Sequence, residues 1–248
     1  MSAAQRNKVL VVGIYLSDKE NHAVTISDAL SSAGAWQVEL RWGAVGDSAP
    51  PDALKSSTRM VSTQRIAKFE FLNRLLAEVD LDDYEYLLVT DDDIEFPSGF
   101  LDAYLEVVAR HGFHLAQPAR THRSYIDHYF VAQLMGVEAR RTRFVEIGPL
   151  FSLHRDLFPL LLPFDERAPM GWGLDFVWPK QIEDAGLTLG IVDQTPVTHA
   201  LRKPVEFYDY GDTNARMQEF LEQCPHLTAE ERFVALQTWP TSPLKADR

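Results

Sequence analysis

The sequence predicts an α/β fold in one domain: a mixed, mostly parallel central sheet flanked by helices. The first observation is that strand patterns alternate with amphipathic helical patterns, the order that builds parallel strands with right-handed crossovers. The second is the segment Tyr84–Phe96, where an apolar, β-prone run leads directly into Asp91, Asp92 and Asp93. Ligand sites in such folds lie at the carboxyl ends of the strands, so the functional prediction centres on this segment.

Composition narrows the class of protein. The chain has 248 residues, of which 46% are hydrophobic and 24% charged, as in an ordinary globular protein. The net charge of −12 argues against general affinity for nucleic acid or anionic membranes. Cys224 is the only cysteine, which favours a reducing compartment. Val9–Leu16 is too short to span a bilayer, and Met1–Lys8 lacks the apolar stretch of a signal peptide. We therefore expect a cytoplasmic protein.

The N-terminal part is expected to contain two strands, Lys8–Leu16 and Trp36–Trp42, separated by a short helix. Gly43–Thr58 is rich in Gly, Pro and Ser, which indicates a surface loop. Ser62–Val79 has apolar residues at a helical period, so it predicts a helix that leads into the acidic strand.

Later elements follow from caps and periodicity. Pro97 and Ser98 start a helix that Gly112 ends, and a capping box of Thr228 with Glu231 starts another near the C-terminus. The remaining expected elements are strands at 114–118, 144–147 and 187–192 and helices at 151–162 and 176–185.

The acidic triplet predicts a metal site. Asp91 and Asp93 project to one side of an extended chain and Asp92 to the other. Three adjacent carboxylates repel one another and are costly to bury unpaired. A divalent cation removes this conflict, and hard oxygen ligands suit Mn²⁺ or Mg²⁺. The alternative is an acidic turn that faces solvent.

Three other residues have candidate roles in the same site. Gly148 follows an expected strand and allows a ligand to approach the backbone closely, although a plain turn explains it equally. Asp175 lies near a helix N-terminus, as a cap or as a general base. The helix dipole would lower its basicity unless burial counters that effect. His199 follows a strand and is a sensible additional ligand for manganese.

Basic and aromatic residues give weaker indications. Arg120, His122 and Arg123 form one basic cluster, and the range 140–143 contains a second. Each is either a solvated loop or a site for phosphate or an acidic acceptor. Aromatic residues that are able to stack on an acceptor ring, or to serve as ordinary core or rim residues, are Trp172, Trp178, Tyr125, Tyr129 and Tyr208.

Taken together, four features resemble GT-A fold glycosyltransferases. They are the strand ending in Asp-Asp-Asp, a glycine after a later strand, the segment Gly171-Trp172-Gly173-Leu174-Asp175, and a downstream histidine. Lys68 precedes the triplet much as a lysine does in the β-1,3-galactosyltransferase and Fringe-like members. Gly171–Phe176 is also similar to an uncharacterised domain family of plant and bacterial proteins. The resemblance spans Lys8–Lys203.

This resemblance implies a role for each matching residue. Asp93 would bind the metal directly, and His199 would complete the protein's share of its ligands. Asp91 would contact either the ribose or, through water, the metal, and Asp175 would match the base of inverting members. Nucleotide-sugar contacts would come from Asp91, Asp92, Lys68, Gly148, Gly13 and Tyr15. Acceptor or loop contacts would come from Trp172, Gly173, Arg120 and Arg123. The membrane anchor of Golgi members is missing, and the Arg or Asn residues that hold the nucleotide in other branches have no certain equivalent in Gly13–His22.

The resemblance also implies a domain plan: a catalytic domain at 1–203, with a nucleotide-binding half at 8–93 and an acceptor half at 94–203. Residues 204–248 would form a helical extension packed on it. The expected function is metal-dependent transfer of a sugar from a nucleoside-diphosphate sugar, a UDP-sugar above all, to a hydroxyl of a glycan or small molecule. The alternatives are a nucleotidyltransferase, or a non-catalytic protein that binds sugar nucleotides or glycans. The first usually needs a glycine-rich basic loop after the first strand, and Ser17–His22 has Lys19 but no glycine.

Overall fold

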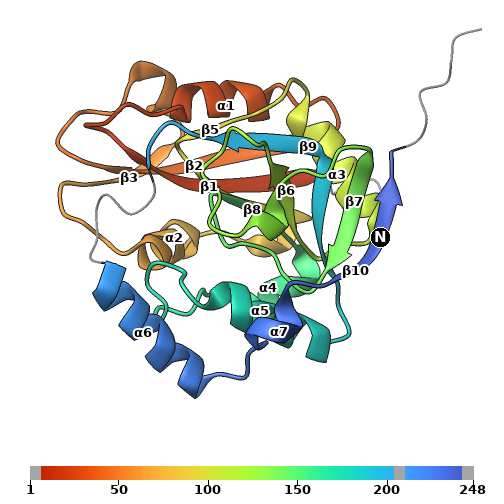
Figure 1. Ribbon diagram of the computed structural model, residues 1–248. Coiled ribbons are helices and arrows are strands. Elements are labelled where there is room, and N and C mark those ends of the chain that lie inside the picture. Colours follow the sequence, from red (N-terminus) through yellow and green to blue (C-terminus); the bar gives the residue numbers. More distant parts are fainter. Residues whose placement is uncertain (1–6, 204–209, 242–248) are drawn as a thin grey trace, which may run out of the picture.

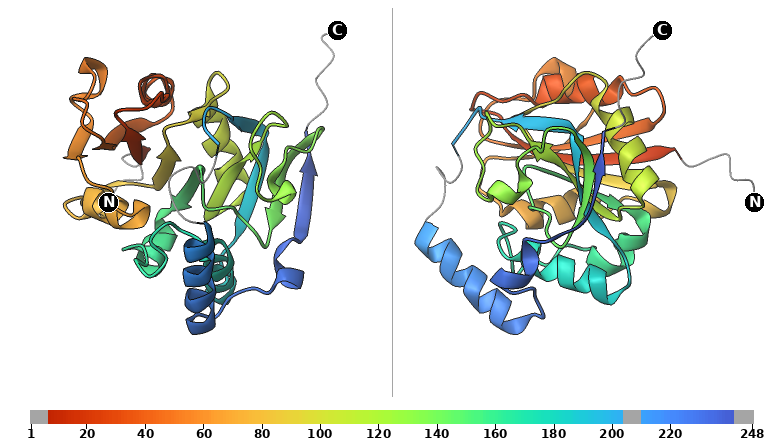
Figure 2. Two further views of the ribbon diagram at one scale, coloured as in Figure 1. Left: turned by 60° about the vertical axis from the view of Figure 1, so that its left-hand side comes forward. Right: turned by 45° about the vertical axis from the view of Figure 1, so that its right-hand side comes forward.

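The computed structural model describes residues 7–203 and 210–241, and a ten-stranded sheet runs through its middle (Figure 1). Helices α1 (Ala23–Ser31) and α3 (Phe100–His111) cover one face of the sheet. Helices α2 (Lys68–Leu76), α4 (Phe158–Leu161) and α5 (Leu174–Asp184) cover the other. Helix α6 (Tyr210–Gln223) lies outside this second layer (Figure 2), where Phe220 and Leu221 join its core.

The order of the strands across the sheet is β10-β7-β9-β6-β8-β4-β1-β2-β3. β8 and β7 run against the others, and the short β5 pairs with β9 off this path. The sheet is therefore mixed and mostly parallel, as the sequence predicted. The strands are β1 (Lys8–Leu16), β2 (Gln37–Val45), β3 (Thr58–Ser62), β4 (Tyr86–Asp91), β5 (Ile94–Glu95), β6 (Leu115–Arg120), β7 (Val137–Thr142), β8 (Leu150–His154), β9 (Leu189–His199) and β10 (Ala235–Pro240).

The continuous apolar runs of β1 and β4 are explained by burial on both faces. Val9 and Val11 face the α1/α3 layer, whereas Leu10 and Val12 face the α2/α5 layer. Gly13 is a packing residue: a Cβ there would lie 2.4 Å from Trp42 Cζ3 and 2.6 Å from the carbonyl oxygen of Thr90. The register of β1 beside β4 brings Leu16 next to the acidic triplet.

Three expected elements of the N-terminal part differ from the structure. The second strand extends to Val45, and Thr58–Ser62 forms the edge strand β3 instead of loop. The following helix therefore starts at Lys68, six residues later than expected. Residues of this edge strand alternate between partly buried and exposed, which gives only a weak hydrophobic pattern. The loop-like composition of the neighbouring segment hides that pattern.

The larger corrections lie in the second half. Residues 144–147, expected to be a strand, are irregular. The strand in this part of the chain is β7, which ends at Thr142 before the expected one begins. The expected helix at 151–162 begins as strand β8, and its helical part is reduced to the single turn of α4. β9 continues to His199 instead of ending at Val192. The capping box of Thr228 with Glu231 is present at the start of α7 (Ala229–Arg232).

The C-terminal segment adds a strand that the sequence analysis did not predict. β10 pairs antiparallel with β7 and extends the sheet, and Trp239 stacks on His111 with ring centroids 4.0 Å apart. Tyr208, named above as a stacking candidate, lies outside the described residues. Within the described ranges, no helix combines the length and the apolar character needed to cross a bilayer.

Candidate active site

The acidic triplet lies at the carboxyl end of β4, in the centre of the sheet. Asp91 is the last residue of the strand, and its backbone N–H donates to the carbonyl of Pro149 at 2.7 Å. Its carboxylate forms an ion pair of 2.5 Å with Lys68, the first residue of α2. Gly148 lies beside this pair: a Cβ there would be 3.7 Å from Lys68 Nζ and 3.9 Å from Asp91 Oδ2. The structure thus brings together Lys68, Asp91 and Gly148, as the resemblance implied.

Asp92 is buried. Its Oδ2 accepts a hydrogen bond of 2.8 Å from the N–H of Leu16 at the end of β1, and its Oδ1 pairs with Arg202. Burial raises the pKa of Asp92 to about 6, although Arg202 opposes the shift. These contacts make Asp92 a connection between β4, β1 and the segment after β9. Its predicted contact with a nucleotide sugar stays a prediction.

Asp93 and His199 meet because β5 pairs antiparallel with β9, with Ile94 opposite His199. His199 Nε2 lies 3.2 Å from Asp93 Oδ1, and Arg202 lies 3.2 Å from Asp93 Oδ2. Burial acts to raise the pKa of Asp93, but the hydrogen bond and charge of His199, with the charge of Arg202, hold that pKa below its ordinary value. The repulsion expected among the three carboxylates is thus offset here by the positive charges of Lys68 and Arg202.

The donor set of Asp91, Asp93 and His199 suits a divalent cation, but two contacts must change for all three to bind it. Arg202 holds Asp93 Oδ2. Arg120 lies 3.3 Å from His199 Nδ1, and because a guanidinium only donates, this contact places the imidazole hydrogen on Nε2, toward Asp93. Among the described residues, the group of three acidic or histidine side chains whose ligand atoms converge within 4.8 Å is a different one.

A buried polar network extends from His199 toward α5. The Arg120 guanidinium is buried, donates to Glu146 at 2.7 Å and also donates to the carbonyl of Gly148. Glu146 in turn lies 3.3 Å from His128 Nδ1. Arg120, expected to contact an acceptor, therefore positions the residues around it.

Asp175 lies in the first turn of α5, after Gly173, which occupies the N-cap. Its Oδ1 is enclosed and has no hydrogen-bond partner among the described residues. Burial raises the pKa of Asp175 to about 7, an effect that nearby His128 opposes and Glu146 reinforces. A buried carboxylate with a pKa close to neutrality is typical of functional sites.

Several predicted site residues lie elsewhere. Tyr15 is buried, and its hydroxyl lies 3.1 Å from Thr58 Oγ1, so packing accounts for Tyr15 as it does for Gly13. Arg123 is exposed. The predicted roles of these three residues stay untested. The second basic cluster forms structural pairs instead: Arg140 with the buried Asp193 at 2.8 Å, and Arg143 with Glu183 at 2.7 Å.

Trp172 and Gly173 belong to a loop that α2 and α6 hold in place. A cavity of about 290 Å³ lies beside this loop. Gly173 packs against Met217 and Phe220 of α6. Residues that line the cavity include Ala67, Met170, Trp172 and Met217.

The sequence analysis did not select Arg202, Glu146 or His128. Arg202 was the easiest to find, because it follows His199 by three residues in a stretch already assigned to the site. Glu146 precedes Gly148 by two residues, but it lay in a segment expected to be an ordinary strand. The sequence around His128 contains no motif that indicates a functional residue.

No family model and no curated protein matches the chain in sequence. Solved structures match in fold. GalNAc-T7 with UDP, GalNAc and Mn²⁺ has a TM-score of 0.55 at 12% identity, over 84% of this chain and 47% of that chain. TarS 1–349 from S. aureus with UDP-GlcNAc has a TM-score of 0.56 at 10% identity, over 86% and 65%. The mannosyltransferase PcManGT from Pyrobaculum calidifontis with GDP-Man and Mn²⁺ has a TM-score of 0.51 at 18% identity, over 80% and 58%.

The matched part therefore spans between 47% and 65% of the length of these chains. Likeness at such identities concerns the backbone arrangement, so the activities of the matched proteins are not carried over with it. The chain has the GT-A fold, as the sequence analysis expected.

Proposed function

We propose that the protein is a glycosyltransferase that uses a nucleoside-diphosphate sugar as donor. The observation that carries the proposal is the acidic triplet at the carboxyl end of β4, surrounded by Lys68, Arg202 and His199. The basic side chains suit a diphosphate, and the carboxylates and the imidazole suit its cation. The matched structures hold UDP, UDP-GlcNAc or GDP-Man, which supports a sugar nucleotide as ligand.

The donor would bind on residues 8–93 and the acceptor on residues 94–203, with 204–248 as a C-terminal extension. Lys68 supports the placement of the donor, because its ammonium group lies beside Asp91 within the first of these ranges. The acceptor half contributes the cavity beside Trp172.

Asp91, Asp93 and His199 would hold Mn²⁺, the ion present in two of the matched structures, or Mg²⁺. Charge that develops on the departing diphosphate would be neutralised by the bound cation. Arg202 contacts both Asp92 and Asp93 and would have to release Asp93, after which a guanidinium still paired with Asp92 would lie beside the cation and its phosphate oxygens.

Asp175 would accept the proton of the acceptor hydroxyl as that oxygen attacks the anomeric carbon, which inverts its configuration. The enclosed Oδ1 of Asp175, which has no hydrogen-bond partner among the described residues, and the pKa raised to about 7 support this role. A base with a pKa near the working pH combines an adequate ionised fraction with a strong driving force for proton transfer. Glu146, His128 and Arg120 would keep the surroundings of the base in place.

The test is to follow product formation with UDP-sugars and GDP-mannose in the presence of Mn²⁺. A glycosyltransferase releases the nucleoside diphosphate and glycosylates an acceptor or water. Pyrophosphate release from a nucleoside triphosphate would instead identify a nucleotidyltransferase. Binding without turnover of any donor would reduce the function to recognition.

A further inference from the structure

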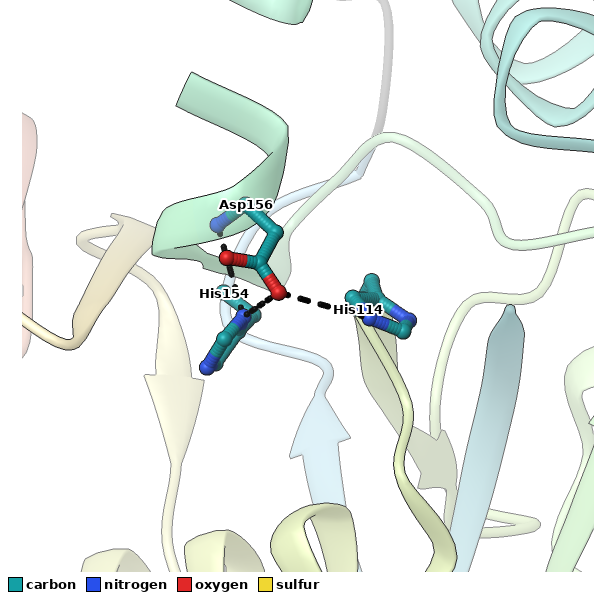
Figure 3. A group of neighbouring side chains, drawn as sticks. All are labelled: His114, His154 and Asp156. Atoms are coloured by element: carbon teal, nitrogen blue, oxygen red, sulfur yellow. Dashed lines mark hydrogen bonds and ion pairs between the residues drawn. The ribbon is translucent and has the colours of Figure 1, made fainter. Parts of the chain in front are cut away.

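A second cluster of metal-ligand side chains lies at the opposite end of β4 from the acidic triplet. Figure 3 shows the carboxylate of Asp156 between the imidazoles of His114 and His154. His154 pairs with Tyr86, the first residue of β4, whereas Asp91 is the last. Five residues of extended chain separate these two ends by about 17 Å. The cluster is therefore independent of the proposed active site.

The backbone fixes all three side chains. β6 and β8 are antiparallel with Leu115 opposite Leu153, so the adjacent His114 and His154 face each other across the two strands. The N–H of His154 donates to the carbonyl of His114 at 2.7 Å. The 3₁₀ turn Arg155–Leu157 places Asp156 over the two rings, and the N–H of Arg155 donates to the carbonyl of Glu85 at 2.9 Å. Ordered strands and a tethered turn thus position the three ligands.

Two of the three spacings between the ligand atoms are close to those of tetrahedral coordination, and all three atoms lie within 4.8 Å of one another. Asp156 Oδ2 lies 3.2 Å from His154 Nδ1 and 3.7 Å from His114 Nε2. Bonds of about 2.0–2.1 Å to a tetrahedral Zn²⁺ ion place neighbouring ligand atoms about 3.3 Å apart. We propose that His114, His154 and Asp156 bind one Zn²⁺ ion, with water in the fourth position.

The second ring nitrogen of His114 is held by Thr188. The backbone N–H of Thr188 donates to His114 Nδ1 at 3.2 Å, and the hydroxyl of Thr188, which donates its own hydrogen to the carbonyl of Gly112, lies 3.1 Å from the same nitrogen. Zn²⁺ at Nε2 requires the imidazole hydrogen on Nδ1, where that hydroxyl can accept it. A hydrogen-bonded second nitrogen is the usual support of a metal-binding histidine.

The competing explanation is a simple ion pair of Asp156 with one protonated histidine. Such a pair uses a single imidazole and gains from protonation of the partner. Two facing imidazoles around one carboxylate instead suit a borderline cation with nitrogen ligands. The acidic triplet offers mainly oxygen and favours Mn²⁺, so the two sites are separable by metal type.

The experiment is a calorimetric titration of Zn²⁺ into the full-length, tag-free and EDTA-treated protein at pH 7.5. We expect one ion per chain, retained in Asp93→Asn, which removes a ligand of the acidic triplet. His114→Gln and Asp156→Asn keep similar volume, and each should weaken Zn²⁺ binding by more than the 10–100-fold typical of losing an outer-shell partner. Exposed His122 provides the matched control, and His122→Gln should leave the affinity unchanged.

Circular dichroism of the metal-free variants separates loss of ligand from loss of fold. Anomalous diffraction from a Zn²⁺-soaked crystal should place the ion between the two imidazoles. The proposal is overturned if wild-type protein takes up no Zn²⁺, or if His114→Gln and Asp156→Asn bind it as tightly as wild type. It is also overturned if Asp93→Asn alone abolishes uptake. None of these results depends on whether the protein transfers sugar.

Discussion

At the scale of single residues, Asp175 carries the proposed chemistry, and its removal is the most direct test. Asp175→Asn keeps shape and polarity but cannot take a proton. We expect transfer to fall by about 10²–10⁴-fold, the usual contribution of general-base catalysis, while nucleotide affinity with Mn²⁺ is unchanged. Asp184→Asn, an exposed carboxylate at the other end of α5, is the control. Undiminished transfer by Asp175→Asn would remove this residue from the mechanism.

The pKa of Asp175 also sets the pH dependence of the wild-type enzyme. A base acts only when ionised, so kcat/KM should rise with pH until the pKa of about 7 and level off above it. Well below that value the expected slope is tenfold per pH unit. Initial rates at subsaturating donor and acceptor between pH 5 and 9 measure the profile. A profile that is flat from pH 5 upward would exclude a base with this pKa.

Stability gives a second view of the same carboxyl group, independent of turnover. Its pKa is raised from 3.8 to about 7 on folding, so between these values the folded state binds the extra proton. Stability of the wild type must then fall as pH rises through this window. Asp175→Asn escapes this loss and should gain relative stability from pH 4 to pH 8, by at most about 4 kcal/mol. Urea unfolding at both pH values measures the difference; Asp184→Asn should show none.

Residue types with strong chemical meaning could be selected from the sequence: the structure brings the triplet, His199 and Lys68 together. It places Asp175 near His128 and Glu146, and the roles of all these residues stay predictions. Arg202 and Glu146 were not selected, because arginine and glutamate are common on surfaces and only the fold shows that both are at least partly buried. The nucleotide-sugar contact that the resemblance implied for Gly13 stays a prediction, and the ring of Trp42 and the carbonyl of Thr90 already require a glycine there.

At the scale of elements, the loop before α5 depends on its contact with α2. Gly171 has φ +88°, and a Cβ there would lie 2.4 Å from Phe69 Cε2, so Gly171→Ala adds both backbone strain and a clash. Gly186 has φ +70° with nothing within 4 Å of an added Cβ. Gly186→Ala should therefore cost only the left-handed backbone penalty of about 1–2 kcal/mol.

The difference between these two variants isolates the packing of the loop. We expect Gly171→Ala to be less stable than Gly186→Ala in thermal unfolding, and to raise KM for the acceptor because Trp172 moves with the loop. Equal unfolding temperatures for the two variants would show that the Phe69 side chain moves aside without loss of stability, and that α2 does not fix the loop.

Elements were predictable where length and caps agreed, as for β1, β4, α3 and α5. The prediction of a helix at 151–162 was wrong because a short apolar run is equally consistent with a buried strand and a buried helix. Here the first four residues of the segment belong to β8, which pairs between β4 and β6, and helical turns occur only after them. Pairing partners distant in sequence decide such cases, and β7 and β10 are further examples.

At the scale of the whole molecule, a protein of net charge −12 must bind a doubly charged phosphate group through a local reversal of field. Lys68 and Arg202 provide part of that reversal, and the cation would provide the rest. Donor binding should therefore depend on metal far more than on any single side chain of the acceptor half.

This dependence can be measured as stability of the entire chain. A nucleoside diphosphate at 100 times its Kd stabilises the folded state by about 2.7 kcal/mol, which for a chain of this size raises Tm by roughly 5–10 °C. We expect that shift for UDP or GDP with Mn²⁺, little of it with EDTA, and its loss in Asp93→Asn. Asp156→Asn lies at the far end of β4 and should keep the full nucleotide shift. A nucleotide shift of equal size in EDTA would mean that Lys68 and Arg202 suffice, and that the acidic triplet binds no catalytic metal.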